Sequence, residues 1–412
     1  MKYCLIGEKL AHSYSQELHA AMGLDYSLVE LSPDNLVDFL HNNDYAGFNV
    51  TIPYKKAVIP HLDRLDETAT LAGAVNTVKR VGNKLVGFNT DIGGMSYMIE
   101  SKGISLKGKN VLMLGSGGTS NTAQALAKLN GAKSVNVVSR SGELNYTNCY
   151  ELTDTEIIIN TTPVGMYPNI CDKPLIELAK FSNLTAVFDC IYNPFRTELL
   201  LEAKALNLVY SDGLPMLVRQ AVLAENIWKG QQDAPQLTET LISTMRQKMA
   251  NVILFGMPSS GKTTLGKFLA QQIGKPFVDL DEYIVEKHGT TPSNIIKQNG
   301  EQYFRQLESA AVDEIAMSVG KVISLGGGTV LDPANVAKLK KNGVFVYIKR
   351  DLQLLTTDNR PLSQAQGVEA LFIKRQSIYN KVKDVEIENN GDCDSAVKEI
   401  KKAYETACNK WS

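Results

Sequence analysis

Apolar and polar positions alternate in short blocks along the first 90 residues. Residues 36–40 carry apolar side chains at helical spacing, whereas other short apolar runs have extended character. The dipeptide Gly82-Asn83 separates two of these runs and is typical of a hairpin turn. Extended segments are therefore expected at residues 3–6, 47–53, 75–78 and 85–88.

From residue 110 onward, the pattern becomes strand, glycine turn, helix and strand. A helix is expected at residues 122–129, and strands are expected at residues 110–114, 134–138, 156–160 and 186–189. Strands that alternate with helices predict a parallel α/β sheet. A new strand, glycine loop and helix begin at residue 251, so the predicted fold class is α/β in both parts of the chain.

A polar stretch that contains proline separates the two parts. Residues 230–236 have the composition of a linker, and residues 238–249 are expected to form a connecting helix. The two glycine loops have different spacings, so we expect them to bind different ligands. The predicted domains are residues 1–92 (completed by about 212–230), residues 93–211, a linker at 231–249, and residues 250–408.

Composition and charge exclude several classes of protein. The chain has 43 basic and 44 acidic side chains and a net charge of −1, which gives no general attraction to nucleic acid or to an anionic membrane. No apolar run approaches the ~18 residues of a membrane span, and the first residues lack a signal-peptide pattern. The six cysteines are scattered, which favours reduced thiols in the cytoplasm. No obligate protein partner is indicated.

The loop from Gly256 to Thr263 matches the pattern G-x-x-x-x-G-K-[ST] in full. It follows an apolar strand and opens a helix, which is the context that a phosphate-binding loop requires. Lys262 is expected to reach the β- and γ-phosphate oxygens, and Thr263 is expected to bind Mg²⁺. Because the guanine signature Asn-Lys-x-Asp is missing, ATP is favoured over GTP. The expected nucleotide contacts are Gly256, Ser259, Ser260, Gly261, Lys262, Thr263 and Thr264.

Two acidic residues follow the extended run at residues 276–278. Asp279-Leu280-Asp281 is interpreted as part of a strand, in which residues i and i+2 share a face, so both carboxylates are expected to point the same way. The next strand runs into glycines with no aspartate after it. Asp279 is therefore expected to complete the magnesium site with Thr263.

Several motifs over residues 251–384 together resemble those of shikimate kinases. Besides the glycine loop, they are Asp279-Leu-Asp281, Gly300-Glu-x-x-Phe-Arg305-x-x-Glu308, Gly326-Gly-Gly328, Arg360-Pro-Leu and Arg375-x-x-x-Tyr379. The resemblance implies catalytic roles for Lys262, for Asp281 as proton acceptor, and for Arg360, which belongs to a lid. It implies a shikimate site formed by Asp281, Arg305, Gly327, Gly328 and Arg375. No arginine stands near residues 354–356, where the family often stacks one on adenine, and the lid segment 357–361 is short.

The first part of the chain has a glycine turn after the strand expected at residues 110–114. Its third glycine position is occupied by Ser120, and the turn by itself could equally be structural. Arg140 stands after the next strand, where an NAD-binding unit has an acidic residue. An arginine between two serines suits a 2′-phosphate and favours NADP. The expected cofactor contacts are Gly115, Ser116, Gly117, Gly118, Ser139, Arg140 and Ser141.

An ordered set of motifs over residues 1–230 resembles shikimate dehydrogenases. The motifs are His12-Ser13-Tyr-Ser15, Asn49 to Lys55, Gly73 to Thr77, Asn89-Thr90-Asp91, Gly115 to Gly118, Ser139-Arg140-Ser141, Tyr192 and Asp212 to Gln220. The resemblance implies that Lys55 and Asp91 are the catalytic pair. It also implies that the serines bind the substrate carboxylate and that other side chains bind ring hydroxyls. The implied substrate residues are Ser13, Ser15, Thr51, Asn76, Tyr192 and Gln220.

The two resemblances imply consecutive reactions. The first is NADPH-dependent reduction of 3-dehydroshikimate to shikimate, and the second is ATP- and Mg²⁺-dependent phosphorylation of shikimate to shikimate 3-phosphate. Two alternatives stay open at this point. The first part could act on quinate, and the second could be a catalytically silent nucleotide-binding module that regulates the first.

Overall fold

The computed structural model describes residues 1–10, 13–356 and 367–411. The chain forms two compact units. Unit 1 contains Met1–Met166 and Asp172–Ile242, and unit 2 contains Tyr167–Cys171 and the chain from Ser243 onward. Most of the stretch expected to be a linker, residues 231–249, forms helix α8 (Pro235–Met249). This helix begins three residues before the predicted connecting helix. None of the described helices is long and apolar enough to cross a membrane.

Unit 1 begins with a mixed six-stranded sheet in the order β2-β1-β3-β5-β6-β4. Its strands are β1 (Lys2–Gly7), β2 (Asp25–Glu30), β3 (Gly47–Val50), β4 (Arg64–Leu65), β5 (Thr77–Val81) and β6 (Lys84–Phe88). The predicted hairpin is confirmed, because β5 and β6 pair antiparallel. The strand expected at residues 47–53 ends at Val50. Pro53 has no N–H for a ladder bond, and the chain turns there as the Tyr54 N–H donates to Thr51 O at 2.9 Å.

The second sheet of unit 1 confirms the predicted parallel arrangement, in the order β11-β10-β9-β7-β8. Its strands are β7 (Asn110–Leu114), β8 (Ser134–Val138), β9 (Ile157–Asn160), β10 (Ala186–Asp189) and β11 (Val209–Ser211). Every residue of β7, β9 and β10 is buried, as expected of a parallel sheet covered on both faces. The helix after β7 starts at Gly118, four residues before the predicted start.

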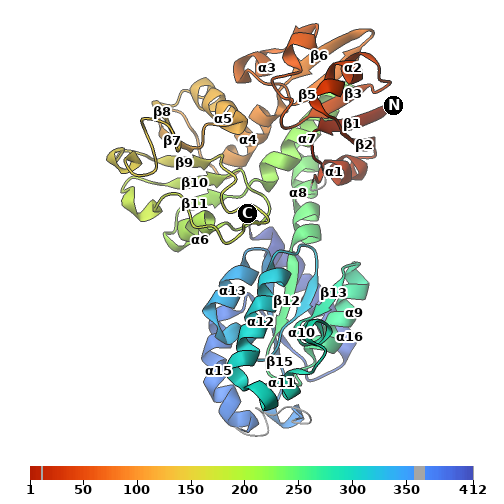
Figure 1. Cartoon of the computed structure of the whole chain (residues 1–412), viewed down its shortest axis with the longest axis vertical. Coiled ribbons are helices and arrows are strands. Elements are labelled where there is room, and N and C mark those ends of the chain that lie inside the picture. The colour runs from red at the N-terminus through yellow and green to blue at the C-terminus, as the bar shows by residue number, and fades with distance from the viewer. Residues whose placement is uncertain (11–12, 357–366, 412) are drawn as a thin grey trace. The chain divides into compact units, whose positions relative to one another are not determined.

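The helices of unit 1 connect and cover these sheets (Figure 1). They are α1 (Ser15–Ala21), α2 (Leu36–His41), α3 (Glu67–Ala72), α4 (Thr90–Glu100), α5 (Gly118–Leu129), α6 (Glu198–Ala205) and α7 (Leu214–Lys229). Helices α4 and α7 pack closely because Gly94 has no side chain. A Cβ at that position would lie 2.6 Å from Met216 O. This contact fixes α4, whose first turn carries the expected catalytic aspartate.

Unit 2 has one parallel sheet in the order β13-β14-β12-β15-β16. Its strands are β12 (Asn251–Phe255), β13 (Phe277–Asp279), β14 (Val322–Ser324), β15 (Gly343–Lys349) and β16 (Val385–Glu388). Helices flank the sheet on both sides (Figure 1). They are α9 (Lys262–Ile273), α10 (Leu280–His288), α11 (Pro292–Asn299), α12 (Glu301–Ala316), α13 (Pro333–Lys340), α15 (Val368–Val382) and α16 (Cys393–Asn409). The glycine loop, Asp279 and the glycines at 326–328 lie at the carboxyl ends of β12, β13 and β14, where such sheets bind ligands. Arg305 and Arg375 lie on α12 and α15.

Candidate active sites

Unit 1 places a lysine and an aspartate in direct contact. Asp91 lies in the first turn of α4, which the Asn89 side chain caps by accepting a hydrogen bond from the Ile92 N–H at 3.2 Å. Lys55 lies in the irregular segment after β3, and its Nζ is 2.6 Å from Asp91 Oδ2. The side chains of Lys55 and Asp91 are 26% and 12% exposed. The ion pair is therefore partly buried, yet a small molecule can reach the lysine.

Asn76 holds the aspartate of this pair. Its Nδ2 donates to Asp91 Oδ1 at 2.9 Å and to Thr90 Oγ1 at 3.0 Å. Its Oδ1 accepts a hydrogen bond from the Thr90 N–H at 2.7 Å. Asn76 is 3% exposed, so water does not compete for these bonds. Both amide hydrogens are used at the start of α4, and Asn76 thus positions Asp91.

The two serines expected to bind the substrate carboxylate lie at the start of α1. Ser13 Oγ accepts a hydrogen bond from the Ser15 N–H at 3.2 Å. Between them, Tyr14 packs edge-to-face against Tyr192, with ring centroids 6.0 Å apart. Burial raises the pKa of Tyr14 to about 12 and also raises the pKa of Tyr192. Both phenols therefore stay neutral hydrogen-bonding groups at physiological pH.

The residues expected to bind ring hydroxyls come from different elements. Thr51 directly follows β3, and its N–H donates to Ile6 O at 2.9 Å. Gln220 lies on α7, where its Nε2 donates to Leu217 O at 2.8 Å. Among the described residues, no direct side-chain hydrogen bond connects Thr51 or Gln220 to the Lys55–Asp91 pair.

A buried polar cluster at the end of β10 was not anticipated from the sequence. Asp189 is 0% exposed. It accepts hydrogen bonds from Asn160 Nδ2 at 2.9 Å, the Ile191 N–H at 3.0 Å and Thr197 Oγ1 at 2.7 Å. Burial raises the pKa of Asp189 to about 7, although these donors oppose the shift. The cluster fixes the chain around Tyr192. The sequence signal that could have predicted it is Asp189, an acidic residue at the end of an otherwise apolar strand.

The glycine turn after β7 fits a dinucleotide phosphate. Gly115 has φ +99°, and a Cβ there would lie 2.8 Å from Thr162 Cγ2, so only glycine fits. Around Gly117 and Gly118, an added Cβ would meet no atom within 4 Å. The start of α5 is therefore open to an anion. Arg140 is exposed after β8 and makes no hydrogen bond within the described part of the chain.

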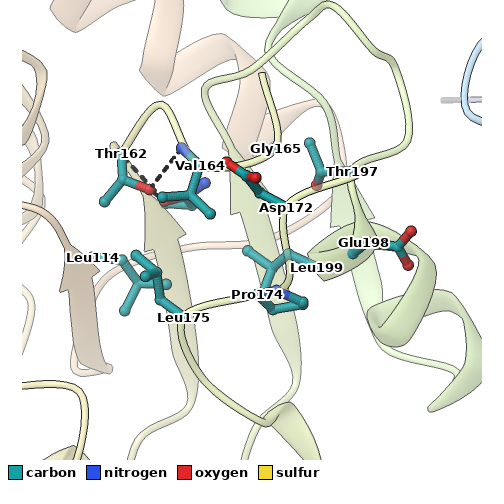
Figure 2. A pocket seen from close by; sticks show the side chains of 11 residues that line it. Leu114, Thr162, Val164, Gly165, Asp172, Pro174, Leu175, Thr197, Glu198 and Leu199 are labelled. Atoms are coloured by element: carbon teal, nitrogen blue, oxygen red, sulfur yellow. Dashed lines mark hydrogen bonds between the residues drawn. The ribbon is translucent and has the colours of Figure 1, made fainter. Parts of the chain in front are cut away.

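Figure 2 shows a small cavity at the carboxyl ends of β7 and β9. Its volume is about 10 Å³, which accommodates about one water molecule. One wall is fixed by Asn160 Oδ1, which accepts hydrogen bonds from the N–H and Oγ1 of Thr162 at 3.0 Å and 2.7 Å. The cavity is too small for a substrate, and none of the predicted site residues lines it.

A wider pocket of about 480 Å³ is formed between the start of α4 and the end of α7. Thr90 and Gly93 line it from α4, the capping residue Asn89 lines it directly before that helix, and Asn226 lines it from α7. It contains neither residue of the expected catalytic pair, so size alone does not identify the reactive site.

In unit 2, the glycine loop joins β12 to α9. Gly256 has φ +150°, and a Cβ there would lie 2.4 Å from Ile348 O. Gly261 also has a positive φ, of +93°. Lys262 is 8% exposed, and its Nζ donates to Gly256 O at 3.2 Å and Met257 O at 2.9 Å. The ammonium group thus lies within the loop, beside the N–H groups that begin α9.

The expected metal-binding side chains are in contact. Thr263 Oγ1 donates to Asp279 Oδ2 at 2.7 Å. Mg²⁺ keeps several waters and needs one or two carboxylates plus phosphate oxygens, so this pair fits the ion. No group of three or more His, Cys, Asp or Glu residues that could hold a metal occurs within the described ranges. Thr264 is exposed in the first turn of α9.

The interpretation of Asp279-Leu280-Asp281 as strand is wrong. Asp279 ends β13 and caps α10, because its Oδ1 accepts hydrogen bonds from the N–H groups of Asp281 and Glu282 at 3.0 Å and 3.3 Å. Asp281 therefore lies in the first turn of a helix. Its Oδ1 is nevertheless 3.3 Å from where a Cβ of Gly326 would lie, so it faces the glycines after β14.

The three glycines after β14 make room for two arginines. A Cβ on Gly328 would lie 2.4 Å from Arg305 Nη2, and one on Gly327 would lie 3.1 Å from Arg375 Nη1. Arg375 is 4% exposed, and its Nη1 donates to Gly327 O at 3.0 Å. The predicted substrate residues Asp281, Arg305, Gly327, Gly328 and Arg375 are therefore brought together around this segment.

Arg305 is oriented by acidic residues of its own helix. Its Nη1 donates to Glu308 Oε2 at 2.7 Å, and its Nη2 donates to Glu301 Oε1 at 3.1 Å. Glu308 is 1% exposed, and its Oε1 accepts a hydrogen bond from Thr329 Oγ1 at 2.6 Å. Glu308 thus connects α12 to the turn after the glycines. Arg360 and the segment 357–361 lie outside the described residues.

Comparison with known proteins finds a family match in each part of the chain. A shikimate dehydrogenase from Methanococcus vannielii is 37% identical over 258 residues, which is 55% of this chain and 90% of that protein. The corresponding protein from Caldicellulosiruptor saccharolyticus is 39% identical and is covered over 91% of its length. The chain belongs to the shikimate dehydrogenase family. Residues 5–78 match the shikimate dehydrogenase substrate-binding domain model, and residues 258–405 match the shikimate kinase model.

Solved structures support the shikimate dehydrogenase assignment of unit 1. A chorismate mutase/shikimate 5-dehydrogenase fusion protein from Clostridium acetobutylicum has a TM-score of 0.57 at 32% identity and covers 60% of this chain and 97% of its own. Shikimate 5-dehydrogenase from Thermus thermophilus, solved with NADP(H) and shikimate, has a TM-score of 0.54 at 30% identity and covers 59% of this chain and 99% of its own.

Proposed function

We propose that the chain is a bifunctional shikimate-pathway enzyme. Unit 1 reduces 3-dehydroshikimate to shikimate with NADPH, and unit 2 phosphorylates shikimate with ATP and Mg²⁺. The observation that carries the first activity is the Lys55–Asp91 ion pair, 2.6 Å long and held by Asn76. The observation that carries the second is the phosphate loop whose Thr263 contacts Asp279, opposite a glycine segment lined by two arginines.

In unit 1, NADPH supplies the hydride. Reduction of a ketone places negative charge on its oxygen and requires one proton to form the alcohol. The Lys55 ammonium stabilises that charge and donates the proton, while Asp91 orients the lysine. Ser13, Ser15, Thr51, Asn76, Tyr192 and Gln220 are proposed to bind the substrate around this pair.

In unit 2, ATP supplies the phosphoryl group, and Mg²⁺ held at Thr263 and Asp279 supplies charge neutralisation. Lys262 holds phosphate oxygens at the start of α9. Arg305 and Arg375 bind the shikimate carboxylate, and Asp281 accepts the proton of the reacting hydroxyl. We retain Arg360 as a further proposed phosphate contact. We also propose a cytoplasmic location and no obligate protein partner, which the scattered cysteines and balanced charge support.

The test is one incubation with 3-dehydroshikimate, NADPH, ATP and Mg²⁺, with products followed by mass. Wild type should form shikimate first and shikimate 3-phosphate afterwards. Lys262→Ala should stop at shikimate, because the phosphate contact is lost while unit 1 is unchanged. Accumulation of shikimate without phosphorylation by wild type would favour the silent regulatory module. Quinate offered with NADP⁺ tests the remaining alternative substrate.

A further inference from the structure

Two residues at the carboxyl edge of the unit 2 sheet have no role in the proposed reaction. The glycine loop follows β12, the central strand in the order β13-β14-β12-β15-β16. Asp279, Asp281 and the glycines at 326–328, around which Arg305 and Arg375 gather, lie after β13 and β14, on one side of the loop. Arg350 directly follows β15 and Asn389 directly follows β16, on the other side.

Both side chains pack against Gly261 of the glycine loop. A Cβ on Gly261 would lie 2.4 Å from Asn389 Nδ2 and 3.8 Å from Arg350 Nη1. Asn389 is 8% exposed, and its Nδ2 donates to Ser260 O at 2.8 Å. The guanidinium group of Arg350 therefore stands next to the start of α9, where the backbone N–H groups bind phosphate.

Two polar atoms at this corner have no hydrogen-bond partner among the described residues. They are Arg350 Nε and Ser260 Oγ, and both atoms are buried. Ser260 is 0% exposed. Burying a donor without an acceptor is unfavourable, and a guanidinium carries five N–H donors and no acceptor. The corner therefore lacks an acceptor, and a negatively charged one fits it best.

The segment that follows Arg350 is held in place at two points. The Asp351 N–H donates to Asn390 Oδ1 at 2.9 Å. Ser259 Oγ donates to Thr356 O at 2.8 Å. These bonds tie residues 351–356 both to the turn after β16 and to the glycine loop. Arg350 is thus presented to the loop by a fixed backbone.

We propose that Arg350 binds the α-phosphate of the nucleotide, a contact that rests on the proposed kinase function. The γ-phosphate must lie beside the acceptor, on the β13–β14 side of the loop. The remainder of the nucleotide then extends toward β15 and β16. The α-phosphate is the last anionic group in that direction, and an arginine binds phosphate oxygens through two parallel N–H bonds.

The test measures binding of Mg²⁺–ADP by calorimetry, without shikimate and without turnover. Arg350→Ala should weaken ADP binding about tenfold, the size expected for a lost charge-assisted hydrogen bond. Arg350→Lys should give a smaller loss, because it keeps the charge without the bidentate geometry. In turnover, KM for ATP should rise while KM for shikimate stays unchanged. Lys349→Ala is the matched control, because Lys349 pairs with Glu386 and Glu388 at 3.3 Å and 3.1 Å.

Inorganic tripolyphosphate separates the phosphate from the base. If Arg350 binds the α-phosphate, Arg350→Ala should weaken tripolyphosphate as much as ADP. If Arg350→Ala weakens ADP binding but leaves tripolyphosphate binding unchanged, Arg350 contacts the nucleoside and the proposal is overturned. The proposal is also overturned if Arg350→Ala and Arg350→Lys both bind ADP with wild-type affinity. Wild type that binds ADP but never phosphorylates shikimate would refute the kinase function and leave the Arg350 contact standing.

Discussion

The two proposed sites differ in the partner that holds a central cation. In unit 1, the Lys55 ammonium is neutralised by Asp91 at 2.6 Å before any substrate arrives. In unit 2, the Arg375 guanidinium donates to the neutral carbonyl oxygen of Gly327 at 3.0 Å. This partner does not neutralise the positive charge of Arg375. A ketone reduction develops one negative charge and ends neutral, whereas a phosphoryl transfer must bind a polyanion throughout.

The two sites also differ in what supports them. In unit 1, a side-chain amide, Asn76, fixes the reactive carboxylate through a 2.9 Å hydrogen bond. In unit 2, glycines at 326–328 let the arginines approach the backbone closely. Unit 1 depends on an ion pair between two side chains, whereas part of the unit 2 site depends on backbone carbonyl groups. Substitution of a side chain should therefore reduce activity to different extents in the two units. The following substitutions test this difference.

The largest loss of activity is expected when the Lys55–Asp91 ion pair is broken. Lys55→Met removes the proton donor and the charge that stabilises the developing alkoxide. NADPH oxidation should fall by about 10³-fold, within the range for a general acid. Steady-state rates with 3-dehydroshikimate measure this loss, while shikimate phosphorylation should be unchanged. The neighbouring exposed lysine provides the control, because Lys56→Met should leave both activities near wild type. Equal losses in the two variants would contradict the assigned role.

An intermediate effect is expected at the support of Arg305. Glu308→Gln keeps the shape of the side chain but removes the buried charge that orients the guanidinium at 2.7 Å. KM for shikimate should rise about tenfold, as for a lost hydrogen bond to a charged group. The kcat should change less, because Glu308 does not touch the reacting atoms. Glu301→Gln removes the more exposed partner and should have a smaller effect. A fall in kcat without a change in KM would rule out this positioning role.

The smallest effect concerns an ionisable group of unit 1 that has no charge to balance it. His19 is 0% exposed and stacks on Tyr26, with ring centroids 4.1 Å apart. Burial lowers the pKa of His19 to about 3, compared with ~6.5 in an unfolded chain. The unfolded state binds more protons between these values. The free energy of unfolding of unit 1 should therefore fall as pH drops from 6.5 toward 3, by at most ~1.4 kcal/mol per pH unit from this residue.

Denaturant unfolding at several pH values measures the His19 contribution. His19→Phe should flatten the pH dependence over this range, because the aromatic packing is kept and the titrating group is removed. His41→Gln is the control, since His41 is exposed. A pH dependence that is the same in wild type and His19→Phe would show that other groups account for the acid sensitivity.

Local patterns were enough to predict much of the fold. The alternation of strands and helices predicted the parallel sheets, and Gly82-Asn83 predicted the β5–β6 hairpin. Local patterns failed to predict the start of a helix where that start depends on a capping side chain. Asp281 was assigned to a strand because it follows the extended run at residues 276–278, but the Asp279 carboxylate accepts hydrogen bonds from two backbone N–H groups and starts a helix at that point.

The sequence by itself determined the chemistry that each unit can perform. The glycine loop, Lys262 and Thr263 are contiguous, so local backbone geometry alone forms the phosphate site. Only the tertiary structure decided which distant groups complete each site. Asn389 reaches Ser260 across 129 positions of the chain, and Asn76 reaches Asp91 across 15. Such contacts depend on the order of strands in a sheet and on helix packing, which no local pattern of residues encodes.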